Sequence, residues 1–176
     1  MKKVIVFAGS NSKKSINKQL ATYASELLEN TTIELLDLND FSLPVFGVDL
    51  EEEQGIPENA IKFLDKIKSS NGIILSLAEH NGAYSAVFKN LFDWMSRAEQ
   101  KTFMNKPMLL MAASPGGRGG ASVLAIAKDR FPRHDAKIIE VFSMPFFGTN
   151  FLDGKIIDDT LNLELTTKVK EFNKAI

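Results

Sequence analysis

The chain has 176 residues, of which 44% are hydrophobic and 24% are charged, and its formal net charge is −1. This composition predicts a single globular domain over residues 1–176, and the near-neutral charge gives no support for a nucleic-acid partner. No apolar run approaches the roughly 18 residues of a membrane span, and a chain with no cysteine and two histidines excludes disulfides and offers little material for a metal site.

The first residues combine two lysines with a short apolar run, as a signal peptide does. The run is brief and leads directly into polar residues, so we interpret it as a strand rather than a leader. On this interpretation we expect the protein to be cytoplasmic and to have no membrane partner.

Five short segments are nearly continuous in apolar character, which is typical of parallel strands with helices on both faces. They are residues 3–8, 33–38, 72–77, 108–113 and 138–142. Apolar stripes at helical spacing lie between and after them, at residues 20–28, 60–67, 84–95, 123–131 and 161–174. The alternation predicts an α/β three-layer sandwich whose five-stranded parallel sheet has the flavodoxin-like order 2-1-3-4-5.

The connection at residues 39–57 is long and has little periodicity. It contains Leu43-Pro44-Val45-Phe46 and then an acidic run at residues 49–53. Two interpretations stay open: a solvated insertion, or a loop that binds substrate or a partner.

Three polar loops follow the first, third and fourth predicted strands, at residues 9–17, 78–83 and 114–120. In a sheet of this order the chains leave strands one and three in opposite directions, and ligands bind at the carboxyl ends of the strands there. We therefore expect the three loops to converge on one site.

The first of these loops places Ser10, Ser15 and Asn17 just before a helix. Backbone N–H groups and the positive end of a helix dipole favour an anion at such a position. The loop lacks both the paired glycines of G-x-G-x-x-G and a G-K-[ST] ending, so it suits one terminal phosphate better than a pyrophosphate. The alternative is that these residues are ordinary turn and N-cap residues.

The other two loops differ in their chemistry. Glu79 is the only acidic residue in the three loops, His80 is a candidate proton donor, and Asn81-Gly82 is a common turn pair. The four glycines of residues 114–120 would let backbone amides lie against a planar ligand. The alternatives are an exposed loop charge, a surface histidine and a flexible connection.

These motifs together resemble the NAD(P)H-dependent FMN reductases, a flavodoxin-like family that includes quinone, azo-dye and chromate reductases. Residues 9–17 are similar to the phosphate loop of the family, and residues 114–120 to its glycine loop. Residues 78–82, followed by Lys89-Asn90 and Asp93-Trp94, are similar to its proline-glutamate-tyrosine-asparagine loop and the helix after it. Ser12, Ala78 and His80 stand where the family has arginine, proline and tyrosine.

The resemblance implies FMN as the bound cofactor, NADH or NADPH as co-substrate, and hydride transfer to a quinone, flavin, azo compound or similar acceptor. It implies no metal and no catalytic side chain. The implied cofactor-binding residues are Ser10, Ser12, Ser15, Ile16, Asn17, Ala78, Glu79, His80, Asn81, Gly82, Ser114, Gly116 and Gly117.

Two further implications concern affinity and assembly. Because the arginine is replaced, a bidentate phosphate contact is lost and FMN affinity is expected to be lower, with Lys13 or Lys14 as nearby cations off the matching position. The family commonly forms dimers or tetramers, which implies a homodimer or homotetramer. Lys89, Asn90, Asp93 and Trp94 would then anchor their helix or lie at the interface, unless the helix is simply amphipathic.

Two other functions stay open. The first is an electron carrier like flavodoxin, against which stands the weak net charge of −1, because carriers usually steer their partners with strong charge. The second is a non-catalytic module that has lost flavin binding through the changes at Ser12, Ala78 and His80.

Overall fold

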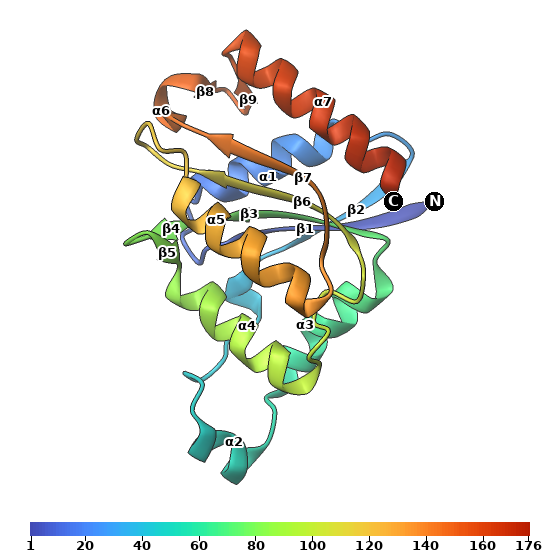
Figure 1. The fold of residues 1–176 in the computed structure, drawn as a ribbon, viewed down its shortest axis with the longest axis vertical. Coiled ribbons are helices and arrows are strands. Elements are labelled where there is room, and N and C mark those ends of the chain that lie inside the picture. The colour runs from blue at the N-terminus through green and yellow to red at the C-terminus, as the bar shows by residue number, and fades with distance from the viewer.

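A computed structural model describes all of residues 1–176 and shows a five-stranded parallel sheet between two layers of helices (Figure 1). The strands are β1 (Lys2–Gly9), β2 (Thr31–Leu36), β3 (Gly72–Leu77), β6 (Pro107–Ala113) and β7 (Lys137–Met144). Their order across the sheet is β2-β1-β3-β6-β7, and every neighbouring pair is parallel. The predicted fold class and the predicted strand order are therefore confirmed.

The helices form the two outer layers (Figure 1). One face of the sheet is covered by α1 (Ile16–Glu26) and α7 (Asp159–Ala175), and the other by α3 (Glu58–Ser69), α4 (Ala86–Ala98) and α5 (Ala121–Arg130). Each central strand contributes to both apolar cores, one on either face. Burial of both faces explains why the strands are continuously apolar instead of alternating.

Consecutive residues of one strand show this division directly. Ile73 and Leu75 of β3 pack in the core beneath α3 and α4, whereas Ile74 between them packs in the core beneath α1 and α7. All three side chains are fully buried. None of the helices combines the length and the apolar character needed to cross a bilayer.

Several short elements complete the chain. They are η1 (Leu38–Asp40), α2 (Val48–Gln54), β4 (Glu79–His80), β5 (Ala83–Tyr84), η2 (Phe131–His134), α6 (Phe147–Asn150), β8 (Phe151–Leu152) and β9 (Lys155–Ile156). The stripe predicted to start at Tyr84 begins as a helix only at Ala86, because Asn81 and Gly82 have φ angles of 51° and 76° and form the two-residue turn of a β4–β5 hairpin.

The long connection at residues 39–57 contains α2 and projects from the body of the protein (Figure 1). The side chains of Asn90 and Trp94 both donate to the carbonyl of Pro44, at 2.9 and 2.8 Å, and the N–H of Phe46 donates to Asn90 Oδ1 at 2.8 Å. Trp94 is fully buried. Asn90 and Trp94 therefore anchor this connection to α4. This agrees with the anchoring role expected for these two residues and not with a simply amphipathic helix.

Candidate functional site

A cavity of about 240 Å³ opens between the loops that follow β1, β3 and β6, at the carboxyl ends of these strands. It is lined by Ser10, Ser12, Lys14, Ser15, Ile16, Asn17, Ala78, Glu79, His80, Ala113, Ser114 and Pro115. Nine of the thirteen predicted cofactor-binding residues are among them, drawn from all three loops. The remaining four, Asn81, Gly82, Gly116 and Gly117, do not line the cavity.

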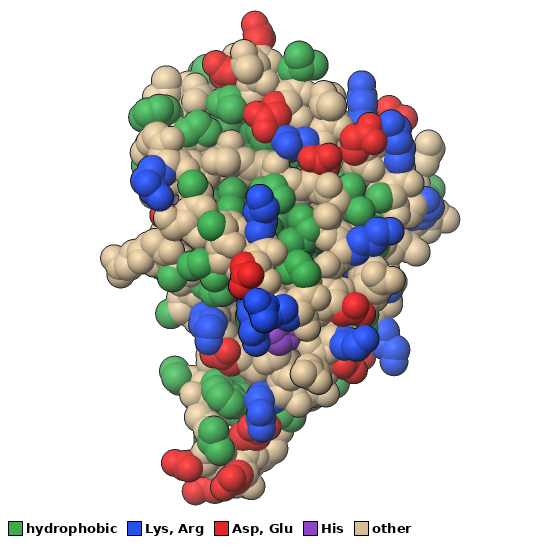
Figure 2. All heavy atoms as spheres, viewed as in Figure 1, with side chains coloured by type: hydrophobic (Ala, Val, Ile, Leu, Met, Phe, Trp, Pro, Cys, Tyr) green, Lys and Arg blue, Asp and Glu red, His purple; other side chains and the backbone are tan.

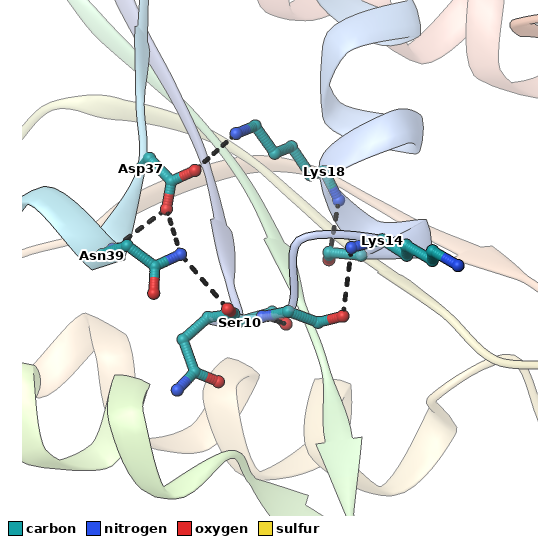
Figure 3. A network of polar contacts seen from close by, with 8 residues as sticks. Ser10, Lys14, Lys18, Asp37 and Asn39 are labelled. Atoms are coloured by element: carbon teal, nitrogen blue, oxygen red, sulfur yellow. Dashed lines mark hydrogen bonds and ion pairs between the residues drawn. The ribbon is translucent and has the colours of Figure 1, made fainter.

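The loop after β1 is shaped by its own hydroxyl groups (Figure 3). Ser10 Oγ accepts a hydrogen bond from the N–H of Ser12 at 3.1 Å, and Ser12 Oγ accepts from the N–H of Lys14 at 3.3 Å. Ser15 is the N-cap of α1, and its Oγ accepts from the N–H of Lys18 at 3.1 Å. The cap interpretation of Ser15 is therefore correct, and because each oxygen accepts here, its own proton remains to be donated to a ligand.

The amino end of α1 faces the cavity. The backbone N–H groups of Ile16 and Asn17 lie in the first turn and have no acceptor within the helix. That first turn also carries no acidic side chain. Free N–H groups at the positive end of a helix dipole, next to serine hydroxyls, form a site suited to an anion such as a terminal phosphate.

The side chain of Asn17, in contrast, forms hydrogen bonds within the protein. It is 3% exposed, and its Oδ1 accepts from the N–H of Ala113 at 2.8 Å and from the hydroxyl of Ser76 at 2.7 Å. Its Nδ2 donates to the carbonyl of Ala113 at 3.3 Å. The amide thus fastens α1 to β3 and β6, and what Asn17 offers a ligand is its backbone N–H.

Residues after β2 brace the same loop from outside (Figure 3). Lys18 Nζ contacts Asp37 Oδ2 at 2.5 Å, and the N–H of Asn39 donates to Asp37 Oδ1 at 2.9 Å. The Lys18 ammonium first, and this N–H second, hold the pKa of the Asp37 carboxyl below its ordinary value. Asn39 Nδ2 in turn donates to the carbonyl of Asn11 at 3.2 Å, which ties η1 to the loop.

Glu79 connects the second loop to α5. Its Oε2 accepts from the N–H of Val123 at 2.9 Å, in the first turn of that helix. The N-cap residue of α5 is Gly120, which has no side chain to provide this bond. Glu79 is therefore a helix cap supplied from another loop and not a free surface charge, whereas His80 is exposed beside it.

The glycine loop after β6 is held by the segment that follows β7. The N–H of Ser114 donates to the carbonyl of Met144 at 3.1 Å, and the N–H of Phe146 donates to the carbonyl of Gly116 at 3.1 Å. A Cβ atom at Gly117 would lie 2.7 Å from Cζ of Phe146. A side chain at Gly117 would displace the 54% exposed ring of Phe146. The two backbone hydrogen bonds fasten the glycine loop to the segment after β7, although residues 115–118 are exposed.

Sequence reasoning left three lining residues, Lys14, Ala113 and Pro115, out of the predicted site. Ala113 and Pro115 flank the predicted Ser114, so adjacency in the chain was the available signal. Phe146, which is 54% exposed and has a φ of 48°, carries no motif that would have marked it.

The comparisons with known proteins agree with this architecture. The family model for NADPH-dependent FMN reductase matches residues 2–148. The chain is 32% identical over 122 residues to an NADPH azoreductase of Bacillus sp. strain OY1-2, with 69% of this chain and 64% of that protein covered. It is 27% identical over 119 residues to a quinone reductase of Escherichia coli K12, with 67% and 63% covered. The matched segment therefore spans less than two thirds of the length of these relatives.

A solved structure is similar over nearly the whole chain. The flavoenzyme NAD(P)H:(acceptor) oxidoreductase FerB from Paracoccus denitrificans superposes with a TM-score of 0.78 at 26% identity, with 99% of this chain and 96% of that one covered. The fold, the loops at the sheet edge and the match over residues 2–148 lead to one conclusion. The chain belongs to the NADPH-dependent FMN reductase family.

Proposed function

We propose that the protein is an NAD(P)H-dependent oxidoreductase that holds FMN at the cavity between its three loops and reduces a small-molecule acceptor. The acceptor classes we propose are quinones, flavins, azo compounds and similar molecules. Quinones and azo compounds appear in the names of the relatives, and flavin appears in the description of the family. The observation that carries the proposal is the anion site at the start of α1, which shares one cavity with the loops after β3 and β6.

The residues of the cavity fit the polar end of FMN. The hydroxyls of Ser10, Ser12 and Ser15 and the N–H groups of Ile16 and Asn17 are donors suited to a phosphate. At about 240 Å³ the cavity is smaller than the roughly 300–1,000 Å³ of most cofactor pockets, so the flavin ring would extend beyond it.

When bound, FMN would supply the redox chemistry, which is the passage of hydride from a nicotinamide nucleotide to an acceptor. The chain contributes position and protons. Glu79 keeps the second loop fixed against α5, and Ser114 keeps the glycine loop closed through its Oγ, which donates to the carbonyl of Gly116 at 2.9 Å. His80 is exposed and lines the cavity, and we assign to it the donation of a proton to the acceptor.

An absorbance spectrum tests the proposal directly. The purified protein is incubated with FMN, desalted and scanned, and retention of flavin bands is expected. Anaerobic addition of NADH or NADPH should then bleach these bands within the time of turnover. A reconstituted protein without flavin bands overturns the proposal, and retained bands that bleach only slowly favour an electron carrier instead.

We also propose that the protein forms a homodimer or homotetramer through the face of α4 and α5. Figure 2 shows apolar side chains gathered on this face among lysine and arginine side chains. A hollow of about 680 Å³ lies between the two helices, and its lining includes Phe92, Ile126 and His134. Light scattering tests this: the wild type is expected at a multiple of 19.5 kDa, and Ile126→Glu closer to the monomer mass.

A cytoplasmic location is the last part of the proposal. It is supported by the apolar run at residues 3–8, which lies in β1 between β2 and β3 and is therefore part of the folded domain. Dependence on NAD(P)H points to the same compartment. Fractionation of cells that express the full chain tests it, and recovery in a secreted fraction would contradict it.

A further inference from the structure

We infer that Lys14 is the cation that makes the cavity select a phosphorylated flavin over an unphosphorylated one. This inference rests on the proposed function, since it concerns how the same site would recognise FMN. It starts from the lysines that lie near the loop after β1 and from which of them faces the cavity.

Three lysines lie close to the loop after β1, and the structure separates them. The ammonium of Lys18 is paired with Asp37 at 2.5 Å and does not line the cavity. All three lysines line a second groove, between α1 and the β8–β9 hairpin, but Lys13, like Lys18, is absent from the cavity. Lys14 is the one lysine that lines the cavity, and it takes part in no ion pair.

No other cation competes for this role. The guanidinium of Arg118 in the glycine loop donates to Ser122 Oγ at 3.0 Å and does not line the cavity. The acidic side chain in the lining, Glu79, is engaged with the N–H of Val123. A phosphate at the start of α1 would therefore meet Lys14 as its only unpaired positive side chain.

The position of Lys14 also allows its ammonium group to contact a phosphate bound at the start of α1. Its backbone N–H is fixed by Ser12 Oγ, one residue before the helix cap Ser15. Its exposed side chain runs outward from the loop, away from Ser10 (Figure 3). The main chain is thus held next to the anion site while the ammonium is free to turn toward it.

Lysine and arginine differ in what they recognise. An arginine fork matches phosphate geometry, whereas an ammonium on a flexible stem acts as a point charge. We therefore expect Lys14 to contribute an exposed and salt-sensitive interaction with the phosphate and none with the flavin ring. The loss on removing it is expected to be about 5- to 20-fold in FMN affinity, as for one charge-assisted contact at a partly exposed site.

The experiment compares FMN with riboflavin, which lacks the phosphate. Dissociation constants are measured by flavin fluorescence with the apo form of the full chain, for the wild type, Lys14→Ala, Lys14→Arg and the matched control Lys13→Ala. Lys14→Ala is expected to weaken FMN about 5- to 20-fold and to leave riboflavin within about 2-fold, and to reduce the salt dependence of FMN binding. Lys14→Arg should restore FMN affinity, and Lys13→Ala should change neither ligand by more than about 2-fold.

The outcomes separate this inference from the proposed function. If the wild type binds FMN but Lys14→Ala binds it equally well, or loses FMN and riboflavin to the same extent, the inference is wrong and the proposed function stands. An equal loss in Lys13→Ala also overturns it, because general basicity would then explain the effect. A wild type that binds neither flavin overturns both.

Discussion

Two helices begin at the same edge of the sheet, and their first turns are used in opposite ways. In α1 the N–H groups of Ile16 and Asn17 face the cavity without an acceptor from the helix. In α5 the N–H of Val123 is already bonded to the carboxylate of Glu79. The chain therefore supplies its own anion to α5 and leaves α1 as the place for an anion from outside.

The difference originates in the residue that precedes each helix. Ser15 caps α1 with its own hydroxyl and leaves the turn open toward the cavity. Gly120 precedes α5 with a φ of 77°, and a Cβ atom there would lie 2.5 Å from Cβ of Ala112. Since no side chain fits at Gly120, the cap of α5 has to come from another loop.

The largest expected effect on stability comes from Asn17→Ala, which removes the hydrogen bonds between α1 and the sheet. The change removes three hydrogen bonds and leaves the N–H and carbonyl of Ala113 and the hydroxyl of Ser76 buried without this partner. We expect the free energy of unfolding to fall by about 2–4 kcal/mol, measured by urea denaturation at pH 7. Asn11→Ala, at an exposed side chain of the same loop, is the control and should stay within about 0.5 kcal/mol. Equal losses in the two variants would contradict the anchoring role.

The next effect tests why α5 has no cap of its own. Gly120→Ala forces a side chain into a left-handed backbone conformation and against Ala112, so we expect a loss of about 2–3 kcal/mol in the free energy of unfolding. Gly116→Ala is the matched control in the same loop, because its Cβ would meet nothing within 4 Å and its φ is not positive. Similar urea midpoints for both variants would show that a side chain at Gly120, close to Ala112, does not lower the free energy of unfolding.

A smaller loss is expected from opening the first turn of α5 with Glu79→Ala. Removal of a helix cap costs about 0.5–2 kcal/mol, and the second loop loses its tie to α5. We therefore expect reduced stability together with weaker binding of both FMN and riboflavin, unlike the phosphate-specific loss at Lys14. Glu79→Gln keeps an acceptor oxygen and should recover most of the stability in the same thermal and urea measurements. If Glu79→Ala has the same stability and flavin affinity as the wild type, the hydrogen bond from Val123 to Glu79 does not stabilise the second loop.

The smallest effect concerns Tyr84, which pairs with Glu79 in the β4–β5 hairpin and stacks on Phe131 beyond α5. Its hydroxyl is buried without a hydrogen-bond partner, and burial raises its pKa from 10.0 to about 12. Tyr84→Phe is expected to change the free energy of unfolding at pH 7 by less than about 1 kcal/mol, as a gain.

The pH dependence of the same residue has a defined direction. Because the pKa is higher in the folded state, the contribution of Tyr84 to stability is complete below pH 10 and is lost as the pH rises through about 12. Tyr84→Phe should flatten that alkaline loss in unfolding measurements between pH 9 and about 12. Tyr23→Phe is the comparison: burial first, and Glu26 second, raise the pKa of Tyr23 too, so this variant should also reduce the alkaline loss. Unlike Tyr84→Phe, it removes a hydrogen bond, from the Tyr23 hydroxyl to Asn162 Oδ1 at 2.6 Å, and should therefore lower stability at pH 7. An alkaline profile unchanged by Tyr84→Phe would contradict the role of burial.

The fold could largely be predicted from the sequence alone. A strand that is buried on both faces has a continuous apolar run, such as residues 72–77. The alternation of such runs with helical apolar stripes permits few topologies. The errors fall where local turn chemistry ends an element. The strand predicted at residues 33–38 ends at Leu36, since Asp37 caps the turn at Leu38–Asp40, and Tyr84 belongs to a hairpin set by Asn81-Gly82.

The site divides in the same way. The sequence by itself determined the hydroxyl-rich loop and its helix start, because Ser12, Lys14 and Ser15 act on groups within a few residues of themselves. Only the tertiary structure decided the tasks of Asn17 and Glu79, whose partners lie 96 and 44 positions away in the chain. It also distinguished Lys14 from Lys18, because the pairing of Lys18 with Asp37 depends on β2 lying beside β1. Such partners are brought together by the order of strands in the sheet, which no local pattern of residues encodes.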